Sequence, residues 1–274
     1  MTSYAPAVPR AVSPSPTGAV AFLGHMLAVA DAEIRKLRHD PLELVMRAVQ
    51  PTLWLVVFGQ VMSHLRGVPT GTLRYLDFMA PGILAQSVLF IAIFYGVSAV
   101  RERDLGVLNK YMVSPISRTA LVLGKAISAG VRALSQGVIV YILALLMGIR
   151  TNWEPWNVAG VLVLIVMGSA VFSTFSLVIA CIVKTHERVM GMGQVMTMPL
   201  FFASNAIYPI VLMPAWLKAV ASVNPLTYEV DGLRALMVQG GTTSFGLGVD
   251  FAVLLAFVAA LVAIATRLYP RLVV

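Results

Sequence analysis

Six apolar runs, each long enough to cross a lipid bilayer, are the feature that most limits what this chain can fold into. A helix needs about 20 residues to cross about 30 Å of hydrocarbon. Within lipid, backbone groups must be paired inside their own segment, and the alternation of about 10 residues that marks a membrane barrel does not occur. We therefore predict an all-α integral membrane protein with six transmembrane helices, at approximately 44–64, 79–100, 122–148, 158–183, 190–211 and 248–268.

The composition agrees with this class. Hydrophobic residues make up 59% of the 274 residues, charged residues only 12%, and the mean hydropathy is +0.87. Soluble domains carry about a quarter charged residues. The formal charge of +8 is not gathered in a long basic run, so we expect membrane lipid and no nucleic acid among the partners.

Basic residues between the runs predict the orientation. With both termini inside, about 15 basic residues fall in cytoplasmic segments, whereas Arg66, Arg74, Arg150, Lys218 and Arg234 fall outside. This bias predicts an N-in, C-in topology. Arginine also outnumbers lysine, which indicates a bacterial genome rich in G and C.

The N-terminal region divides into two parts before the transmembrane domain, residues 41–274. Residues 1–20 are rich in proline and small polar residues, and we expect a disordered cytoplasmic tail. Residues 21–40 place apolar and basic side chains on different faces of a helix, which predicts an amphipathic helix on the inner membrane surface. A simple basic topology anchor is the alternative.

The third run is longer than a bilayer requires, so its first turns are expected to project below the membrane. Polar residues recur at helical spacing on one face, at Lys125, Ser128, Arg132 and Gln136. Either they face the bundle interior or a partner, or they form a projecting base whose cations reach the cytoplasm. Small residues every four positions, which would let another helix approach closely, are Ala129, Ala133 and Gly137.

The segment from 208 to 241 is broken by prolines and contains two helical patterns, neither long enough to span. We predict two short re-entrant helices that dip into the outer leaflet before the sixth span. Asn224 before Pro225 is expected to cap the second helix, and Asp231 and Arg234 are spaced to pair.

No catalytic, cofactor or metal site is predicted. The histidines are scattered without an HExxH pair, and Cys181 lies alone in an apolar run, where we expect a buried small hydrophobe. Gly124 and Lys125 lack the other residues of a P-loop. No carboxylate lies near the middle of a predicted span, which argues against a carrier coupled to protons or sodium. Energy for transport would then come from outside the chain.

Two stretches carry a family resemblance, "APGILAQSVLFIAIFYGVSAVRERDLGVLNKYMVSPISRTALVLGKA" and "NPLTYEVDGLRALM". Their order resembles the ABC-2 type exporter permeases, above all the daunorubicin-resistance permeases, over about residues 20–270. The resemblance implies a permease of the bacterial inner membrane that works as a homo- or heterodimer with a second copy or paralogue. It would export an amphipathic, drug-like or lipid-like substrate, with ATP and Mg on a separate ABC ATP-binding subunit. A lipid-modifying membrane enzyme and a secondary transporter are the alternatives.

The resemblance also places a cytoplasmic coupling helix, which docks on the ATPase, at 101–114. Leu105, Leu108 and Met112 give it an apolar face, and acidic residues lie at its expected start, where the helix dipole favours anions. The predicted docking residues are Arg101, Glu102, Asp104, Leu105, Leu108, Lys110, Tyr111 and Met112.

Two further sets of residues complete the sequence prediction. Aromatic and methionine side chains suit the path of an amphipathic cargo, although they suit plain helix packing equally well. The possible path residues are Phe90, Phe94, Tyr95, Met196, Met198, Phe201, Phe202 and Asn205. By resemblance, an extracellular gate includes Asn224, Pro225, Glu229, Asp231 and Arg234.

Overall fold

Four long helices correspond to four of the apolar runs. The computed structural model describes residues 46, 49–65, 69–104, 118–183 and 185–269, and within these ranges it contains helices and no β-strand. Each of the four helices is long and apolar enough to cross a membrane. In the first of them, the candidate span is the part from Tyr75 to Tyr95. They are α4 (Tyr75–Asp104), α6 (Arg118–Leu146), α7 (Pro155–Ile182) and α11 (Leu247–Leu268).

The first and fifth runs form shorter helical segments. The described part of the first is helical at 49–52, continues as the π-helix η1 (Leu53–Gly59) and ends as α3 (Gln60–Leu65). The fifth was predicted at 190–211, but α8 (His186–Phe202) has 17 residues and contains Pro199 in its last turn. The described residues therefore hold four candidate spans, and the six-span topology and its orientation stay predictions.

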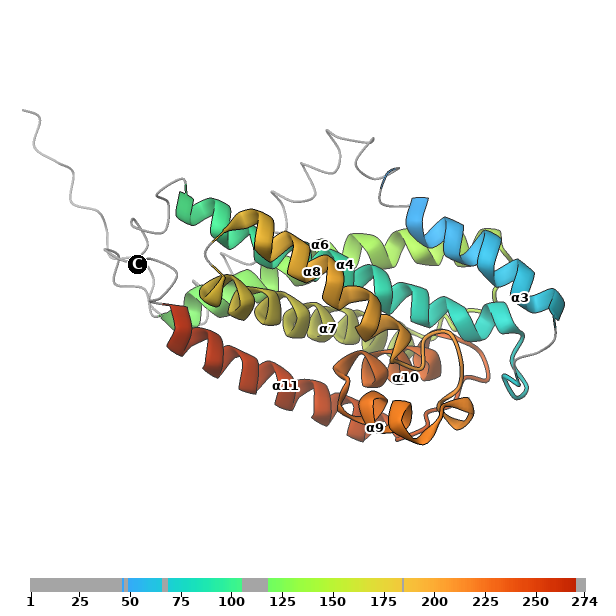
Figure 1. The fold of residues 1–274 in the computed structure, drawn as a ribbon. Coiled ribbons are helices and arrows are strands. Elements are labelled where there is room, and N and C mark those ends of the chain that lie inside the picture. The colour runs from blue at the N-terminus through green and yellow to red at the C-terminus, as the bar shows by residue number, and fades with distance from the viewer. Residues whose placement is uncertain (1–45, 47–48, 66–68, 105–117, 184, 270–274) are drawn as a thin grey trace, which may run out of the picture.

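The helices lie side by side in an elongated bundle, with α7 packed against α4, α6 and α11 (Figure 1). Small residues permit the contact between α6 and α7. Ala129 and Ala133 are fully buried, and a Cβ added at Gly137 would lie 2.8 Å from Cδ1 of Ile165. The predicted close approach is confirmed, and α7 is the partner. Cys181, near the end of α7, is a buried member of an apolar cluster, as expected.

The polar stripe of α6 turns partly toward the bundle interior. The guanidinium of Arg132 lies 5.1 Å from the ring centroid of Tyr95 on α4. Gln136 is 2% exposed, and the Ser128 hydroxyl is buried and donates to the carbonyl of Gly124 at 2.9 Å. Of the two alternatives for this stripe, the interior position therefore holds for these three residues.

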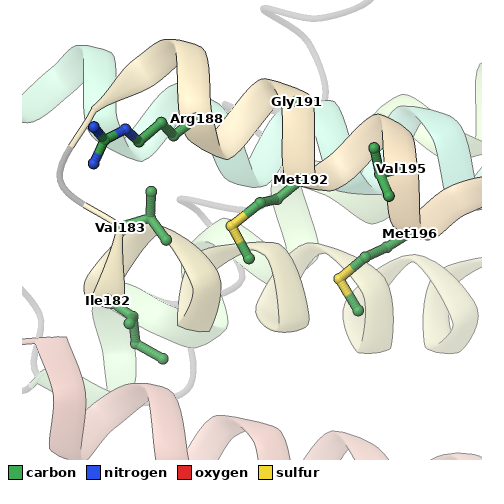
Figure 2. Close-up of a pocket in the computed structure, with 7 residues that line it drawn as sticks. All are labelled: Ile182, Val183, Arg188, Gly191, Met192, Val195 and Met196. Atoms are coloured by element: carbon green, nitrogen blue, oxygen red, sulfur yellow. The ribbon is translucent and has the colours of Figure 1, made fainter.

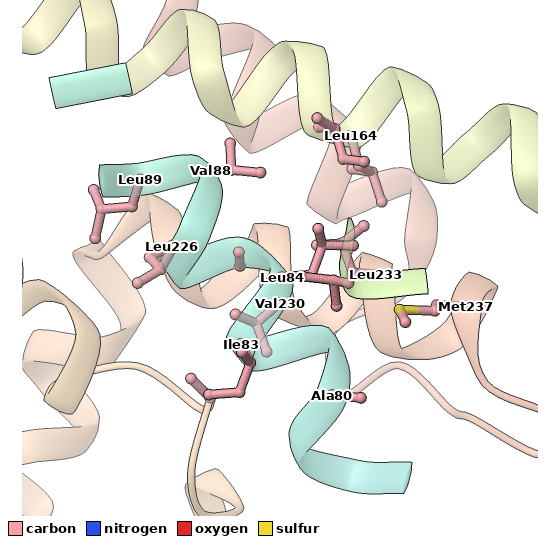
Figure 3. Close-up of a cluster of buried hydrophobic side chains, with 14 of the residues drawn as sticks. Ala80, Ile83, Leu84, Val88, Leu89, Leu164, Leu226, Val230, Leu233 and Met237 are labelled. Atoms are coloured by element: carbon pink, nitrogen blue, oxygen red, sulfur yellow. The ribbon is translucent and has the colours of Figure 1, made fainter. Parts of the chain in front are cut away.

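Two short helices lie at one end of the bundle, α9 (Ala215–Val223) and α10 (Pro225–Met237), after the single turn η2 (Ile210–Leu212) (Figure 1). This confirms the two predicted short helices. Apolar side chains of α10 interlock with those of α4, and Leu164 of α7 lies beside them (Figure 3). As a result α10 is held by α4, α7 and α11 at once.

The end of α6 nearby is closed by a Schellman motif. Gly148 adopts a φ of 65°, its N–H donates to Leu145, and the N–H of Ile149 donates to the carbonyl of Ala144 at 2.9 Å. A glycine suits this position because it adopts a left-handed conformation without steric cost. The loop to α7 therefore begins at backbone that these hydrogen bonds hold in place.

The contact between α4 and the turn after α8 depends on a missing side chain. A Cβ added at Gly82 would lie 2.5 Å from the carbonyl oxygen and 2.7 Å from the Cα of Ala206. These are backbone atoms, so relief requires that the turn move away from α4.

We expect Gly82→Ala to lower the free energy of unfolding by about 1–3 kcal/mol, because the added methyl overpacks a filled contact. The measurement is thermal unfolding of the detergent-purified protein followed by size-exclusion chromatography. Gly124→Ala on α6 is the matched control, since a Cβ at Gly124 meets nothing within 4 Å. Equal melting temperatures of the two variants would contradict the close contact.

Candidate functional site

The candidate site is the polar cluster that α10 carries into the end of the bundle. Three charged side chains of this helix are nearly or fully inaccessible: Glu229 and Asp231 are 0% exposed and Arg234 is 5% exposed. Buried charges are costly unless they are paired or hydrogen-bonded. Their partners therefore show what the cluster does.

Asn224 joins the ends of two helices. Its side-chain oxygen accepts from the N–H of Leu226 at 3.1 Å and so caps α10, with Pro225 at the first helical position. Its amide nitrogen donates to the carbonyls of Leu200 at 2.7 Å and Ala203 at 3.2 Å, at the end of α8. The cap predicted from sequence is confirmed, and the link to α8 is an addition that the structure reveals.

Arg234 holds the turn that follows α8. Its guanidinium donates to the carbonyl of Asn205 at 2.6 Å and to that of Phe78 at 3.3 Å, and it lies 3.8 Å from the centroid of the Phe78 ring. Burial lowers the pKa of Arg234 to about 10, an effect that nearby Asp231 opposes. The group therefore stays cationic at neutral pH.

Asp231 binds partners other than the one predicted. Its carboxylate accepts from the N–H of Ser244 at 2.6 Å, from that of Phe245 at 3.1 Å and from the Asn205 amide at 3.3 Å. No ion pair joins it to Arg234, because the two side chains are directed to different backbone groups. The carboxylate instead fixes the segment that leads into α11.

Further contacts close the same end of the bundle. Arg74 makes a two-pronged ion pair with Asp77 at the start of α4, at 2.8 and 2.9 Å, and also donates to the carbonyl of Gly148 at 2.6 Å. The Tyr75 hydroxyl donates to the carbonyl of Ile207 at 3.1 Å. The loop after α6, the start of α4 and the turn after α8 are thus tied together.

Two carboxyl groups near this network have no hydrogen-bond partner among the described residues. Glu229 is directed at Gly168 of α7, where a Cβ would overlap the carboxyl group. Asp250, in the first turn of α11, is also 0% exposed. Burial raises the pKa of Glu229 well above its usual value, which favours the neutral carboxyl group.

The possible path residues do not gather in one place. Phe201 and Asn205 are buried inside the chain. Phe94, Met198 and Phe202 are 38–45% exposed. Met196 lines a groove on α8 and Tyr95 lies against Arg132, while Phe90 stacks on Phe94 with centroids 6.2 Å apart.

Sequence reasoning missed an aromatic cluster beside these residues. Trp54 of the first helical segment lies 5.2 Å from Phe58, 5.5 Å from Phe201 and 6.5 Å from Phe202, measured between ring centroids. The cluster joins the first and fifth apolar runs. The one signal in the sequence was Trp54 itself, an aromatic residue in the middle of the first apolar run.

The coupling segment lies mainly outside the described residues, including Leu105, Leu108, Lys110, Tyr111 and Met112. The part that is described differs from expectation, because residues 101–104 form the last turn of α4 and not the start of a separate helix. Arg103 bonds Asp104 there at 2.8 and 3.0 Å. Helix α4 continues through Glu102 and Asp104, and the coupling helix itself stays a prediction.

Comparison with known proteins defines the class. The ABC-2 type transporter family model matches residues 25–238, so the chain belongs to this family. A putative transport permease ycf38 of Cyanophora paradoxa is 27% identical over 227 residues, 78% of this chain and 74% of the relative. The daunorubicin resistance ABC transporter permease protein DrrB1 of Streptomyces coeruleorubidus is 28% identical over 236 residues, 86% and 81% of the two chains.

Nodulation protein J of Rhizobium meliloti is also similar, 22% identical over 199 residues, 72% of this chain and 74% of the relative. The chain is therefore a membrane permease of an ABC transporter, and its named permease relatives are transport proteins rather than catalytic enzymes. Among the described residues, no group of three or more His, Cys, Asp or Glu is placed to hold a metal ion.

The double role of Asn224 generates one prediction. Asn224→Ala removes a cap and two donors to buried carbonyls, and we expect it to lower the free energy of unfolding by about 1–3 kcal/mol. Asn224→Asp keeps an acceptor for the cap but has no amide donor, so it should not restore stability. Thermal unfolding measures both, and a stable Asn224→Asp variant would mean that the bonds to α8 contribute nothing.

The burial of Glu229 generates a second, pH-dependent prediction. The unfolded chain loses this proton near pH 4.5 and the folded chain loses it at a higher pH, so the free energy of unfolding falls as the pH rises above about 4.5. Glu229→Gln should be more stable than the unmodified protein, by a margin that grows from pH 5 to pH 8 by at most about 1.4 kcal/mol per unit.

Thermal unfolding at pH 5, 6.5 and 8 tests this margin. Glu187→Gln, at an exposed position in the first turn of α8, is the control and should show no such trend. If Glu229→Gln is less stable at every pH, the native carboxyl is charged and paired, and the prediction is wrong.

Proposed function

We propose that this permease exports an amphipathic, drug-like or lipid-like substrate from the cytoplasm across the bacterial inner membrane. ATP and Mg would be bound by a separate ABC ATP-binding subunit, and two permease chains, identical or paralogous, would form the channel. The name of the relative DrrB1 supports drug efflux. The distribution of basic residues supports a topology with both termini inside.

The observation that carries the proposal is the burial of the charged residues of α10 beside the C-terminal end of α8. Asn224 and Arg234 bind carbonyls at and after the end of α8, and Asp231 binds the start of the segment to α11. A shift of α8 would break several of these bonds together. We therefore infer that Asn224, Pro225, Glu229, Asp231 and Arg234 belong to an extracellular gate.

Helix α4 would connect this gate to the ATPase. It has 30 residues and is about 45 Å long at 1.5 Å per residue. Tyr75 and Phe78 contact the turn and the gate at one end, while Asp104 leads into the proposed coupling segment at the other. A push on residues 101–114 when two ATPases close would thus reach the gate through one continuous helix.

The substrate path would follow the apolar surface of α4 and α8. Phe94, Met198 and Phe202 are accessible there, and methionine and aromatic side chains adapt to varied apolar ligands. Phe90, Tyr95 and Met196 would lie along the same route. Phe201 and Asn205, being buried, would support the path from behind rather than touch the cargo.

Reconstitution tests the proposal. The permease is co-expressed with its ABC ATP-binding partner, which we expect to be encoded beside it. The complex is purified and placed in liposomes, and transport of the amphipathic dye rhodamine 6G is followed. We expect transport that requires both proteins and ATP with Mg. Transport by the permease alone, or turnover of a lipid without the ATPase, would overturn it.

The docking claim predicts the result of two substitutions. Leu108→Asp and Met112→Asp should leave the permease folded in membranes but abolish both co-purification with the ATPase and ATP-dependent transport, because each places a charge on an apolar docking face. Leu212→Asp in η2, at the other end of the bundle and 48% exposed, is the control and should retain the partner. An active complex with both coupling variants would show that the ATPase docks elsewhere.

A further inference from the structure

A groove of about 840 Å³ runs along α8 beside the end of α7 (Figure 2). Its size falls within the range of about 300–1,000 Å³ typical of small-molecule sites. From Arg188 to Met196 it follows about 12 Å of helix. The residues that line it include Ile182, Arg188, Gly191, Met192, Val195 and Met196.

The wall of this groove is apolar along most of its length. Met192 and Met196 extend from α8 toward α7, and Ile182 lies at the end of α7 (Figure 2). Gly191 makes the wall concave, since a Cβ added there meets nothing within 4 Å. Unbranched methionine side chains adapt readily to a flexible apolar chain. This surface suits a hydrocarbon tail.

One end of the groove is cationic. Arg188 lies in the first turn of α8, is exposed, and its guanidinium has no acceptor among the described residues. A cation near the N-terminus of a helix interacts unfavourably with the helix dipole, so Arg188 does not stabilise α8. Thr185 makes no capping bond from its side chain, and the first amides of α8 also favour an anion. Glu187 is exposed but does not line the groove.

We propose that this groove binds one anionic phospholipid of the inner leaflet. The phosphate of the headgroup lies at Arg188, and one acyl chain follows Met192, Val195 and Met196. Basic pockets between transmembrane helices on the cytoplasmic side favour such lipids. The choice of leaflet follows from the predicted orientation, which places residues 184–188 at the cytoplasmic surface. The site shares Met196 with the proposed substrate path. Lipid retention is measured on the permease without ATP or the ATP-binding subunit, so failure of this proposal can be distinguished from failure of the transport proposal.

The experiment counts bound lipids by native mass spectrometry. The full chain is purified from nanodiscs that contain equal amounts of phosphatidylglycerol and phosphatidylcholine. We expect retention of one phosphatidylglycerol per chain. Arg188→Gln should reduce this retention about fivefold, the factor that corresponds to one basic residue at a lipid surface. Arg267→Gln, an exposed arginine in the last turn of α11, is the control and should retain the lipid.

A second variant tests the apolar part of the site. Gly191→Leu fills the groove from an open position, so we expect it to fold normally and lose the lipid. Gly124→Leu, at another helical glycine with open space, is its control. Equal retention of both lipids, or unchanged phosphatidylglycerol in Arg188→Gln and Gly191→Leu, would overturn the proposal. A shift from dimer to monomer in these variants without lipid loss would mean that a second copy covers the groove, and would also overturn it.

Discussion

The packing of this protein depends on hydrogen-bond donors for the backbone carbonyls at the end of α8. When a helix stops inside a protein, its last carbonyls lose their partners, and each buried polar group without a partner is costly. The carbonyls of Leu200, Ala203 and Asn205 are left in this position, and side chains of Asn224 and Arg234 donate to them. The short helix α10 is positioned so that its first and last turns reach the same turn of the chain.

This arrangement explains the packing around it. The turn after α8 can lie against α4 only because Gly82 has no side chain, and Tyr75 of α4 donates to it. Asp231 uses its carboxylate for the backbone that leads to α11, which lets Arg234 act on the turn instead of forming an ion pair. The short helix α10, which could not cross a membrane, is thereby built into the protein interior.

The same region combines satisfied and unsatisfied polar groups. Arg234 and Asp231 are held by several hydrogen bonds, whereas the carboxyl groups of Glu229 and Asp250 have none among the described residues. Buried groups of this kind are uncommon and often mark strain or function. Both carboxyl groups lie in the same end of the bundle as the residues of the proposed gate.

The sequence by itself determined the class of protein, because long apolar runs leave only helices as a solution in lipid. It also determined the small-residue contact of α6 and the cap at Asn224, since both depend on local spacing. The tertiary structure decided where α8 ends, which partner Asp231 binds, and that residues 101–104 belong to α4. These features depend on groups far apart in the chain. Asn224 donates to carbonyls that lie 21 and 24 residues before it, and the contact of Arg234 with Phe78 spans 156 residues. No local pattern records such pairings, because they exist only once the helices have packed.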